Sequence, residues 1–515
     1  MDRSGLTEHS GWSERSSSLS RLDAPAWVAT ALLLVLSIAL WVTPYLPMVD
    51  LPQHATQLSI WVHASDPLFA EPGRFLVNWR TPYLGAYLVA RVLAICMGVL
   101  PALKVVVWAS LTLHLVAFWR LVDKLGYPSW LGLLGLPLGL GYGFQYGFIS
   151  FIGAVPLGLF AVSLALEHRE RPALRSALWL ALTLCAALAT HGFLLGMTLA
   201  VIGPLLLRGG GRFVARVLPL CAPGLLALIW LMPGSSAKSI GYTIWDPRLL
   251  DLVQVPALMV SASAFDHVAS VFGVLFLTLV AVCLGRPRRA PEFFVPLASM
   301  LLGYCLFPLM MGGFGPLHPR FVAFIVPCSL LAFEPRQSLW FEHLPAVIAL
   351  SCVAWLTLFV ARLQAFTRET APLANFVAQM PSGLSIRPII FERDGAAFPG
   401  LPAMLHLSGY YAAEKGGRQG YSFAMYPTSA VRYSANVVPT MSGGSEWHPE
   451  YWSENEVDDY DCILVRSATD RSAELFATRA GDVRLAFHER DWWAYATSSF
   501  PSFSASSNDH RATGK

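Results

Sequence analysis

Long apolar runs separated by short polar turns fill the first two thirds of the chain. They lie at residues 27–43, 103–119, 130–140, 148–166, 177–190, 193–207, 217–232, 268–284, 294–311, 321–333 and 344–360. A predominantly apolar helix of roughly 20 residues crosses a bilayer. The pattern therefore predicts a mainly α, polytopic membrane helix bundle of about eleven spans. The short runs at 130–140 and 321–333 are expected to extend into flanking Gly/Pro-rich segments.

Basic residues gather in every second turn between these runs. With the N-terminus inside, the cytoplasmic turns hold Arg120, Lys124, Arg169, Arg171, Arg175, Arg208, Arg212, Arg216, Arg286, Arg288, Arg289 and Arg336. The opposite turns at 142–147 and 191–192 hold no Lys or Arg. Because basic loops resist translocation, the alternation predicts a cytoplasmic N-terminus and places everything after Arg362 outside.

The polar segments divide the chain into four parts. Residues 1–23 are Ser-rich and predict a disordered cytoplasmic tail. Residues 24–362 form the transmembrane domain, with a long first outer loop at 44–102. Residues 363–501 predict a small extracytoplasmic α/β domain, and 502–515 a disordered tail.

Local patterns support this division. In the outer domain we expect a helix over 368–379, strands over 384–391 and 461–466, and a hairpin formed by 483–488 and 492–497. The first apolar run could also be a signal peptide. It is followed by PYLP at 44–47 rather than by a small-residue cleavage site, which favours an uncleaved anchor.

Composition excludes several classes of protein. Only 13% of the residues are charged, against about 25% in soluble domains, and the mean hydropathy is +0.51. A soluble enzyme, a collagen-like fibre and a disordered chain are excluded. The net charge of +3 indicates no nucleic-acid partner. Seven of the eight cysteines lie in or beside apolar runs, which predicts neither disulfides nor a zinc site.

Three motifs in the first third of the chain suggest a family. Residues 48–54 read MVDLPQH directly after the first span, residues 78–84 read NWRTPYL, and residues 120–126 read RLVDKLG. This order resembles the GT-C superfamily of membrane glycosyltransferases, which use polyprenyl-phosphate-linked sugars. The stretch GFISF at 147–151 also resembles a branch of bacterial membrane proteins.

The resemblance implies a glycosyltransferase of the bacterial inner membrane. It would move a sugar from a polyprenyl-phosphate donor to a hydroxyl of a lipid, glycan or protein acceptor on the extracytoplasmic face, among membrane lipids. An inverting transfer needs a general base, and Asp50 occupies the position of the acidic residue after the first span. The alternative is that Asp50 starts a turn or caps a helix. His54 would orient Asp50, bind phosphate or face the membrane interface.

Cationic side chains are needed for the phosphate leaving group. Arg80 and Arg320 are the best candidates, because the guanidinium fork binds phosphate oxygens in pairs; the alternative is an anchor to lipid headgroups. His318, in the same loop as Arg320, joins the predicted substrate-binding set. His191 lies at a tight outer turn. An ionisable group at membrane depth is a candidate for a functional role; the alternative is a turn residue whose hydrogen bonds are satisfied.

A second acid is missing from the next outer loop, residues 141–147, where several GT-C relatives carry charge. Asp246 or Asp266 with His267 could supply it, or form local turns. Together with Asp50 and His54, Asp266 and His267 could surround a divalent cation, but no spacing demands one, so we expect no cofactor and no metal. Two other classes stay open, a transporter or flippase of lipid-linked precursors and a non-catalytic membrane scaffold.

Overall fold

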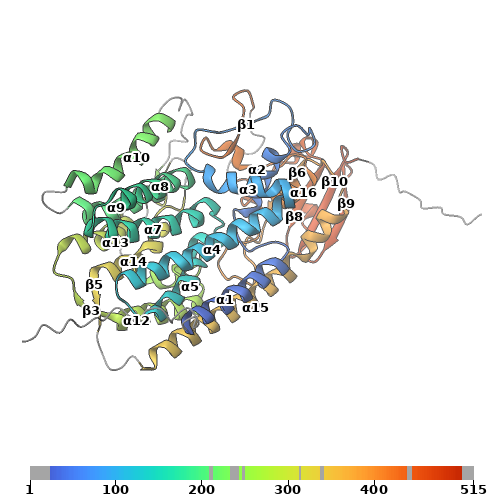
Figure 1. Ribbon diagram of the computed structural model, residues 1–515. Helices are drawn as coiled ribbons and strands as arrows, with labels where there is room; N and C mark the ends of the chain where they lie inside the picture. The colour runs from blue at the N-terminus through green and yellow to red at the C-terminus, as the bar shows by residue number, and fades with distance from the viewer. Residues whose placement is uncertain are drawn as a thin grey trace, which may run out of the picture.

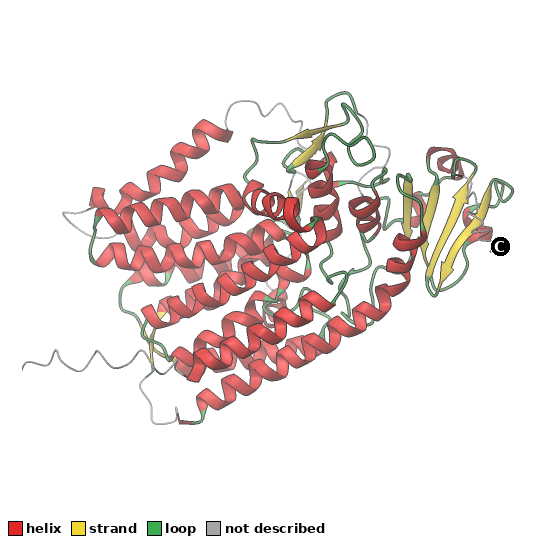
Figure 2. Cartoon of the chain, turned by 45° about the vertical axis from the view of Figure 1, so that its right-hand side comes forward, coloured by secondary structure: helices red, strands yellow, loops and turns green. Residues whose placement is uncertain are grey.

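The computed structural model describes residues 24–207, 213–231, 243–245, 250–311, 315–336, 342–437 and 444–501. The predicted tails at 1–23 and 502–515, and Asp246, lie outside these residues. The described chain is mainly helical, with a bundle at one end and a small sheet at the other (Figures 1 and 2).

Five described helices are long and apolar enough to cross a membrane: α1 (Ala24–Val42), α4 (Val99–Lys124), α7 (Ile149–Glu170), α10 (Phe213–Leu231) and α15 (Leu344–Gln379). Shorter apolar helices accompany them: α3 (Leu84–Met97), α8 (Leu174–Thr190), α9 (Gly192–Leu207), α12 (His267–Cys283), α13 (Val295–Leu306) and α14 (Val322–Ala332). These features define a multi-pass membrane protein. The number of crossings stays a prediction.

The outer helices of the bundle are apolar on every side. In α1, Leu32, Leu36 and Leu40 are buried, while Leu34 and Ile38 are exposed. The buried side packs on α15, which runs beside α1 in both views (Figures 1 and 2). A helix that is apolar all round belongs in a core or a membrane, so the exposed side of α1 suits the lipid.

The run at 130–140 does not form a single spanning helix. It divides into the 3₁₀ helix η1 (Ser129–Leu134) and the five-residue α5 (Gly135–Gly139). Pro128 precedes η1 and Pro137 lies within α5. Eleven helical residues extend only about 16 Å, roughly half of the hydrocarbon core. Gly132 and Gly135 let this segment pack closely on α4, where a Cβ on Gly132 would lie 2.7 Å from the Trp119 ring.

The C-terminal sheet confirms the predicted strands. Its order is β6 (Ile386–Ile390), β8 (Cys462–Arg466), β10 (Trp492–Thr497) and β9 (Val483–Glu489). β6 runs parallel to β8, while β10 is antiparallel to both β8 and β9. The predicted boundary between residues 362 and 363 falls inside α15, which runs without a break from the bundle to the sheet (Figure 2).

The first loop, residues 44–102, folds onto the C-terminal domain. It contains α2 (Leu51–Val62) and β1 (Phe75–Val77), and β1 pairs with β7 (Val431–Tyr433). α2 packs on α16 (Ser408–Lys415), where Thr56 Oγ1 donates to the Gly409 carbonyl at 3.0 Å and Ser59 Oγ donates to the Ala413 carbonyl at 2.8 Å. Segments far apart in sequence thus meet at one end of the bundle.

The remaining short elements connect these parts. They are α6 (Tyr142–Gln145), α11 (Val255–Leu258), α17 (Ser472–Leu475), η4 (His318–Phe321), and the pairs β2 (Thr243–Ile244) with β4 (Met310–Met311) and β3 (Leu284–Pro287) with β5 (Phe333–Pro335).

Candidate active site

A cavity of about 450 Å³ lies where the first loop, the bundle and the C-terminal domain meet. This volume is typical of small-molecule sites, which range from roughly 300 to 1,000 Å³. Four of the six predicted site residues line it: Asp50, His54, His191 and Arg320. Polar and aromatic residues complete the wall, among them Tyr83, Tyr87, His406, Tyr421, Phe423 and Trp447.

Asp50 reaches the cavity because of how α2 begins. The Asp50 backbone N–H donates to the Tyr146 carbonyl at 3.0 Å, and its carbonyl accepts from the His54 N–H at 3.1 Å. The carboxylate makes no capping hydrogen bond to α2, so it remains available to the cavity. Gly147, at φ +81°, permits this backbone approach, since a Cβ there would lie 2.8 Å from the Asp50 nitrogen.

The carboxyl of Asp50 is suited to accept a proton. Burial raises its pKa to about 6, and this rise is limited by the positive charges of His406 and Arg320. A carboxyl with this pKa is ionised at neutral pH and still binds a proton readily, as a general base must.

His54 is a neutral hydrogen-bonding group in this site. Burial and, to a smaller extent, the positive charge of His406 lower its pKa to about 3. Its Nδ1 lies 2.5 Å from the Tyr87 hydroxyl, which donates to Gln57 Oε1 at 3.1 Å. These contacts fix the ring beside Asp50.

Arg320 and His191 form the opposite wall. Arg320 Nη1 lies 3.1 Å from His191 Nε2, and Arg320 Nε donates to the Pro316 carbonyl at 3.0 Å. The guanidinium carbon lies 4.2 Å from the centre of the Phe148 ring. The guanidinium is therefore held as a fixed, nearly buried cation, and His191 is held in turn by the Leu194 N–H, which donates to its Nδ1 at 3.2 Å.

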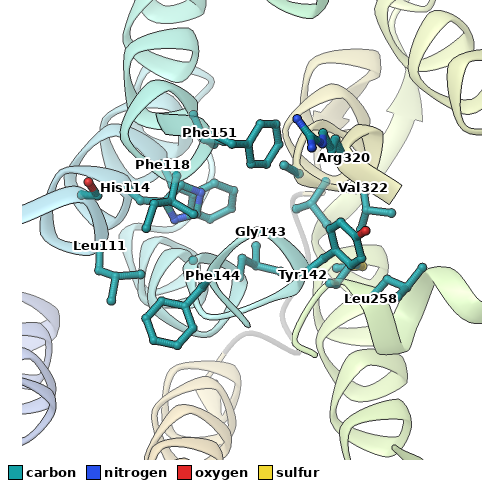
Figure 3. A pocket seen from close by; sticks show the side chains of 18 of the residues that line it. Leu111, His114, Phe118, Tyr142, Gly143, Phe144, Phe151, Leu258, Arg320 and Val322 are labelled. Carbon is teal, nitrogen blue, oxygen red and sulfur yellow. The ribbon is translucent and has the colours of Figure 1, made fainter. Parts of the chain in front are cut away.

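A smaller cavity of about 50 Å³ lies deeper in the bundle, behind Arg320 and Phe151 (Figure 3). Its walls are mostly apolar side chains of α4, α6, α7 and α14. His114 lines it and donates from Nδ1 to the Gly135 carbonyl at 2.8 Å. His114 is thus packed within the bundle, as expected from its position in the middle of a span. The space holds at most a water or two.

Arg80 and His318 lie away from the main cavity. Arg80 is exposed beyond β1, and its backbone N–H donates to Asn78 Oδ1 at 3.2 Å. His318 is buried with its ring edge-on to Tyr304, the ring centres being 5.3 Å apart. Their predicted contacts to substrate stay predictions.

The candidate second acid, Asp266, is committed elsewhere. Both of its carboxylate oxygens accept from the Arg362 guanidinium, and Oδ1 also caps α12 by accepting from the Ala269 N–H at 3.0 Å. Within the described part of the chain, no group of three or more His, Cys, Asp or Glu side chains is placed to hold a metal.

Two titratable residues of the site were not predicted. His406 Nε2 lies 4.0 Å from Asp50 Oδ1, and His406 Nδ1 lies 2.7 Å from Oε2 of the buried Glu446. The His406 ring stacks on Tyr421 at 5.0 Å and meets Trp447 edge-on at 5.6 Å.

The fold and the site define a multi-pass membrane protein with a cavity, lined by polar and aromatic residues, that its helical and C-terminal parts share. No family model and no curated protein matches the sequence. Similar solved structures include the following two. Arabinofuranosyltransferase AftD from mycobacteria shares 13% identity at a TM-score of 0.49, over 92% of this chain and 40% of AftD, so the chain spans well under half of that protein. ArnT from Cupriavidus metallidurans, bound to undecaprenyl phosphate, shares 11% identity at a TM-score of 0.49, over 93% of this chain and 100% of ArnT. These values assign neither family nor activity.

Proposed function

We propose that the protein is a membrane glycosyltransferase that moves a sugar from a polyprenyl-phosphate donor to an acceptor hydroxyl, with Asp50 as general base. The observation that carries the proposal is the presence, in one cavity, of the Asp50 carboxylate, which does not cap α2, and of the fixed Arg320 guanidinium. Asp50 and Arg320 both line that cavity, and their charges interact there. This combination provides a proton acceptor and a phosphate contact for a single reaction.

The transfer follows from these two groups. The acceptor oxygen forms a bond to the anomeric carbon while its proton passes to Asp50. The bond between that carbon and the phosphate oxygen breaks, and the electron pair leaves with the polyprenyl phosphate. Arg320, supported by His191, stabilises the charge that develops on the phosphate. Attack from the side opposite the phosphate inverts the anomeric centre.

Aromatic side chains supply the surface for the sugar. Tyr421, Phe423 and Trp447 line the cavity on the side of the C-terminal domain. Tyr and Trp offer an apolar face for a sugar ring and a polar tip for its hydroxyls. The same domain would therefore help to hold the acceptor, while the lipid chain lies in the apolar bundle.

The alternation of basic turns supports an extracytoplasmic site. The cavity lies on the side of the C-terminal domain, which follows the last apolar helix. The reaction would thus take place at the outer face of the bacterial inner membrane.

Mass spectrometry of lipid and glycan fractions tests the proposal in cells. A deletion strain is complemented with wild type, Asp50→Asn or Asp66→Asn, the last as a matched change in an exposed residue of the same loop. We expect the deletion and Asp50→Asn to lose the same sugar-sized mass, and Asp66→Asn to keep it. A glycan that returns fully with Asp50→Asn refutes the role of Asp50. Lost movement of a lipid-linked precursor with intact transfer indicates a flippase, and no change in any strain indicates a scaffold.

A further inference from the structure

The C-terminal domain brings a second charged pair to Asp50. Glu446 is fully buried, and its two carboxylate oxygens each accept from His406. Oε1 accepts from the backbone N–H at 2.7 Å and Oε2 from Nδ1 at 2.7 Å. Since Nδ1 carries the proton given to Glu446, Nε2 is the ring atom that faces Asp50, at 4.0 Å.

The backbone at His406 keeps the ring in this orientation. His406 has φ +63°, a conformation that non-glycine residues seldom adopt. The double contact with Glu446 and the stacking on Tyr421 hold the residue there. A strained backbone that aims one side chain into a cavity is a feature typical of functional positions.

The charges around the pair favour an imidazolium. Burial alone would lower the pKa of His406, but the carboxylates of Glu446 and Asp50 raise it more, so the net shift is upward. Other titratable groups surround the pair. Arg320 is a second cation that lowers the pKa of Asp50, and the charge of His406 lowers the pKa of His54. The charge of Asp50 raises the pKa values of four nearby hydroxyls, those of Tyr87, Tyr142, Tyr146 and Tyr421.

We propose that His406, held by Glu446, is a positioning residue through which the C-terminal domain keeps the Asp50 carboxylate charged for proton abstraction. This inference rests on the proposed function. In this role His406 acts through Asp50. The first loop and the C-terminal domain would then form one catalytic unit, and neither would be competent without the other.

The size of the effect follows from the distance. Two unit charges 4 Å apart change each other's proton affinity by about one to three pH units, depending on how well water screens them. Removing the imidazolium should therefore raise the pKa of Asp50 from about 6 to roughly 7–9. A shift of about two units lowers the rate at pH 7 about tenfold and leaves the rate at high pH unchanged.

The test is the pH–rate profile of His406→Gln and Glu446→Gln. The substrate is the lipid extract of deletion cells, and the readout is release of free polyprenyl phosphate. We expect the acidic limb to move to higher pH by about one to three units in His406→Gln, and by less in Glu446→Gln, with the plateau rate retained. His448→Gln is the matched control, because His448 forms the same kind of pair with Glu450, 2.7 Å apart, on an exposed part of the same segment.

Loss of rate by one factor at every pH, or an unmoved acidic limb, overturns the proposal. If the His406 and Glu446 variants do not fold, the same interaction is measured from the other side, because each charge shifts the pKa of the other by the same amount. In Asp50→Asn, the pKa of His406 should fall by about one to three units, as followed by histidine-selective ¹⁵N NMR. An unchanged pKa of His406 overturns the proposal. If Asp50→Asn itself retains full transfer activity, the proposed function has failed. If Asp50→Asn is inactive but the His406 profile is unmoved, only this inference has failed.

Discussion

Replacing Arg320 by Gln should weaken binding of a polyprenyl phosphate. The guanidinium is only 8% exposed, lies over Phe148 and contacts His191. A fixed, poorly solvated cation forms strong charge-assisted hydrogen bonds with phosphate oxygens. Gln keeps a planar polar group at this position but removes the positive charge.

The magnitude follows from the contacts that are lost. A hydrogen bond to a charged group contributes about 1.5–3 kcal/mol. At about 1.4 kcal/mol per factor of ten, the dissociation constant for the lipid phosphate should rise roughly 10- to 150-fold. His191→Ala, which removes a neighbour of the guanidinium and leaves the charge, should have a smaller effect.

Binding is measured with undecaprenyl phosphate and purified protein in nanodiscs, with thermal melting as the check on folding. Arg418→Gln is the control, since Arg418 is an exposed arginine that does not line the cavity. An unchanged affinity in Arg320→Gln, or an equal loss in Arg418→Gln, would refute the assignment of Arg320 as the phosphate contact.

Two further predictions concern pH and stability. Asp50 must be ionised to accept a proton, and burial raises its pKa to about 6. The rate should therefore fall about tenfold for each pH unit below that value. A log-rate profile that stays flat from roughly two pH units below this pKa to one unit above it contradicts the role. Arg362→Met leaves the buried Asp266 carboxylate without its partner and should cost about 3–5 kcal/mol of stability, whereas Arg286→Met, which breaks an exposed pair, should cost at most about 1 kcal/mol. Thermal melting compares the two variants, and equal losses contradict the argument from burial.

Periodicity and hydropathy were sufficient for most helices but not for their ends. The last span was predicted to stop near residue 360 and a separate helix to cover 368–379, yet α15 joins the two without a break and ends at Gln379. Its second half carries many polar residues but buries Leu363, Phe366, Leu373 and Phe376 at helical spacing. Phe366 and Phe376 contact the rings of Phe398 and Phe487 in the C-terminal domain. Spans are recognised by hydropathy, whereas an amphipathic extension is recognised by the tertiary surface that covers it.

The site could be predicted only in part. Asp50 was predicted because it follows the first span, where the family that the sequence resembles carries an acidic residue, and it lines the cavity. His406 and Glu446 carry no local signal, because they meet only after α16 docks on α2 and the chain near Ile390 contacts Glu446, whose carbonyl accepts from the Ile390 N–H at 3.0 Å. Arg80 shows the converse: a residue of suitable chemistry in the right loop that folds outside the cavity.

The most direct test of the account is turnover of the lipid donor by purified protein. Wild type and Asp50→Asn are incubated with the lipid extract of deletion cells, which should hold the unspent donor, and mass spectrometry follows conversion of glycosylated polyprenyl phosphate to the free phosphate. Wild type should release the free lipid phosphate with a matching gain of mass on an acceptor. Asp50→Asn should be slower by a factor on the order of 10² to 10⁴, the range for loss of a general base, while binding undecaprenyl phosphate as wild type does. Equal turnover by the two proteins, or no turnover by wild type, would contradict the claim that this cavity transfers sugars with Asp50 as its base.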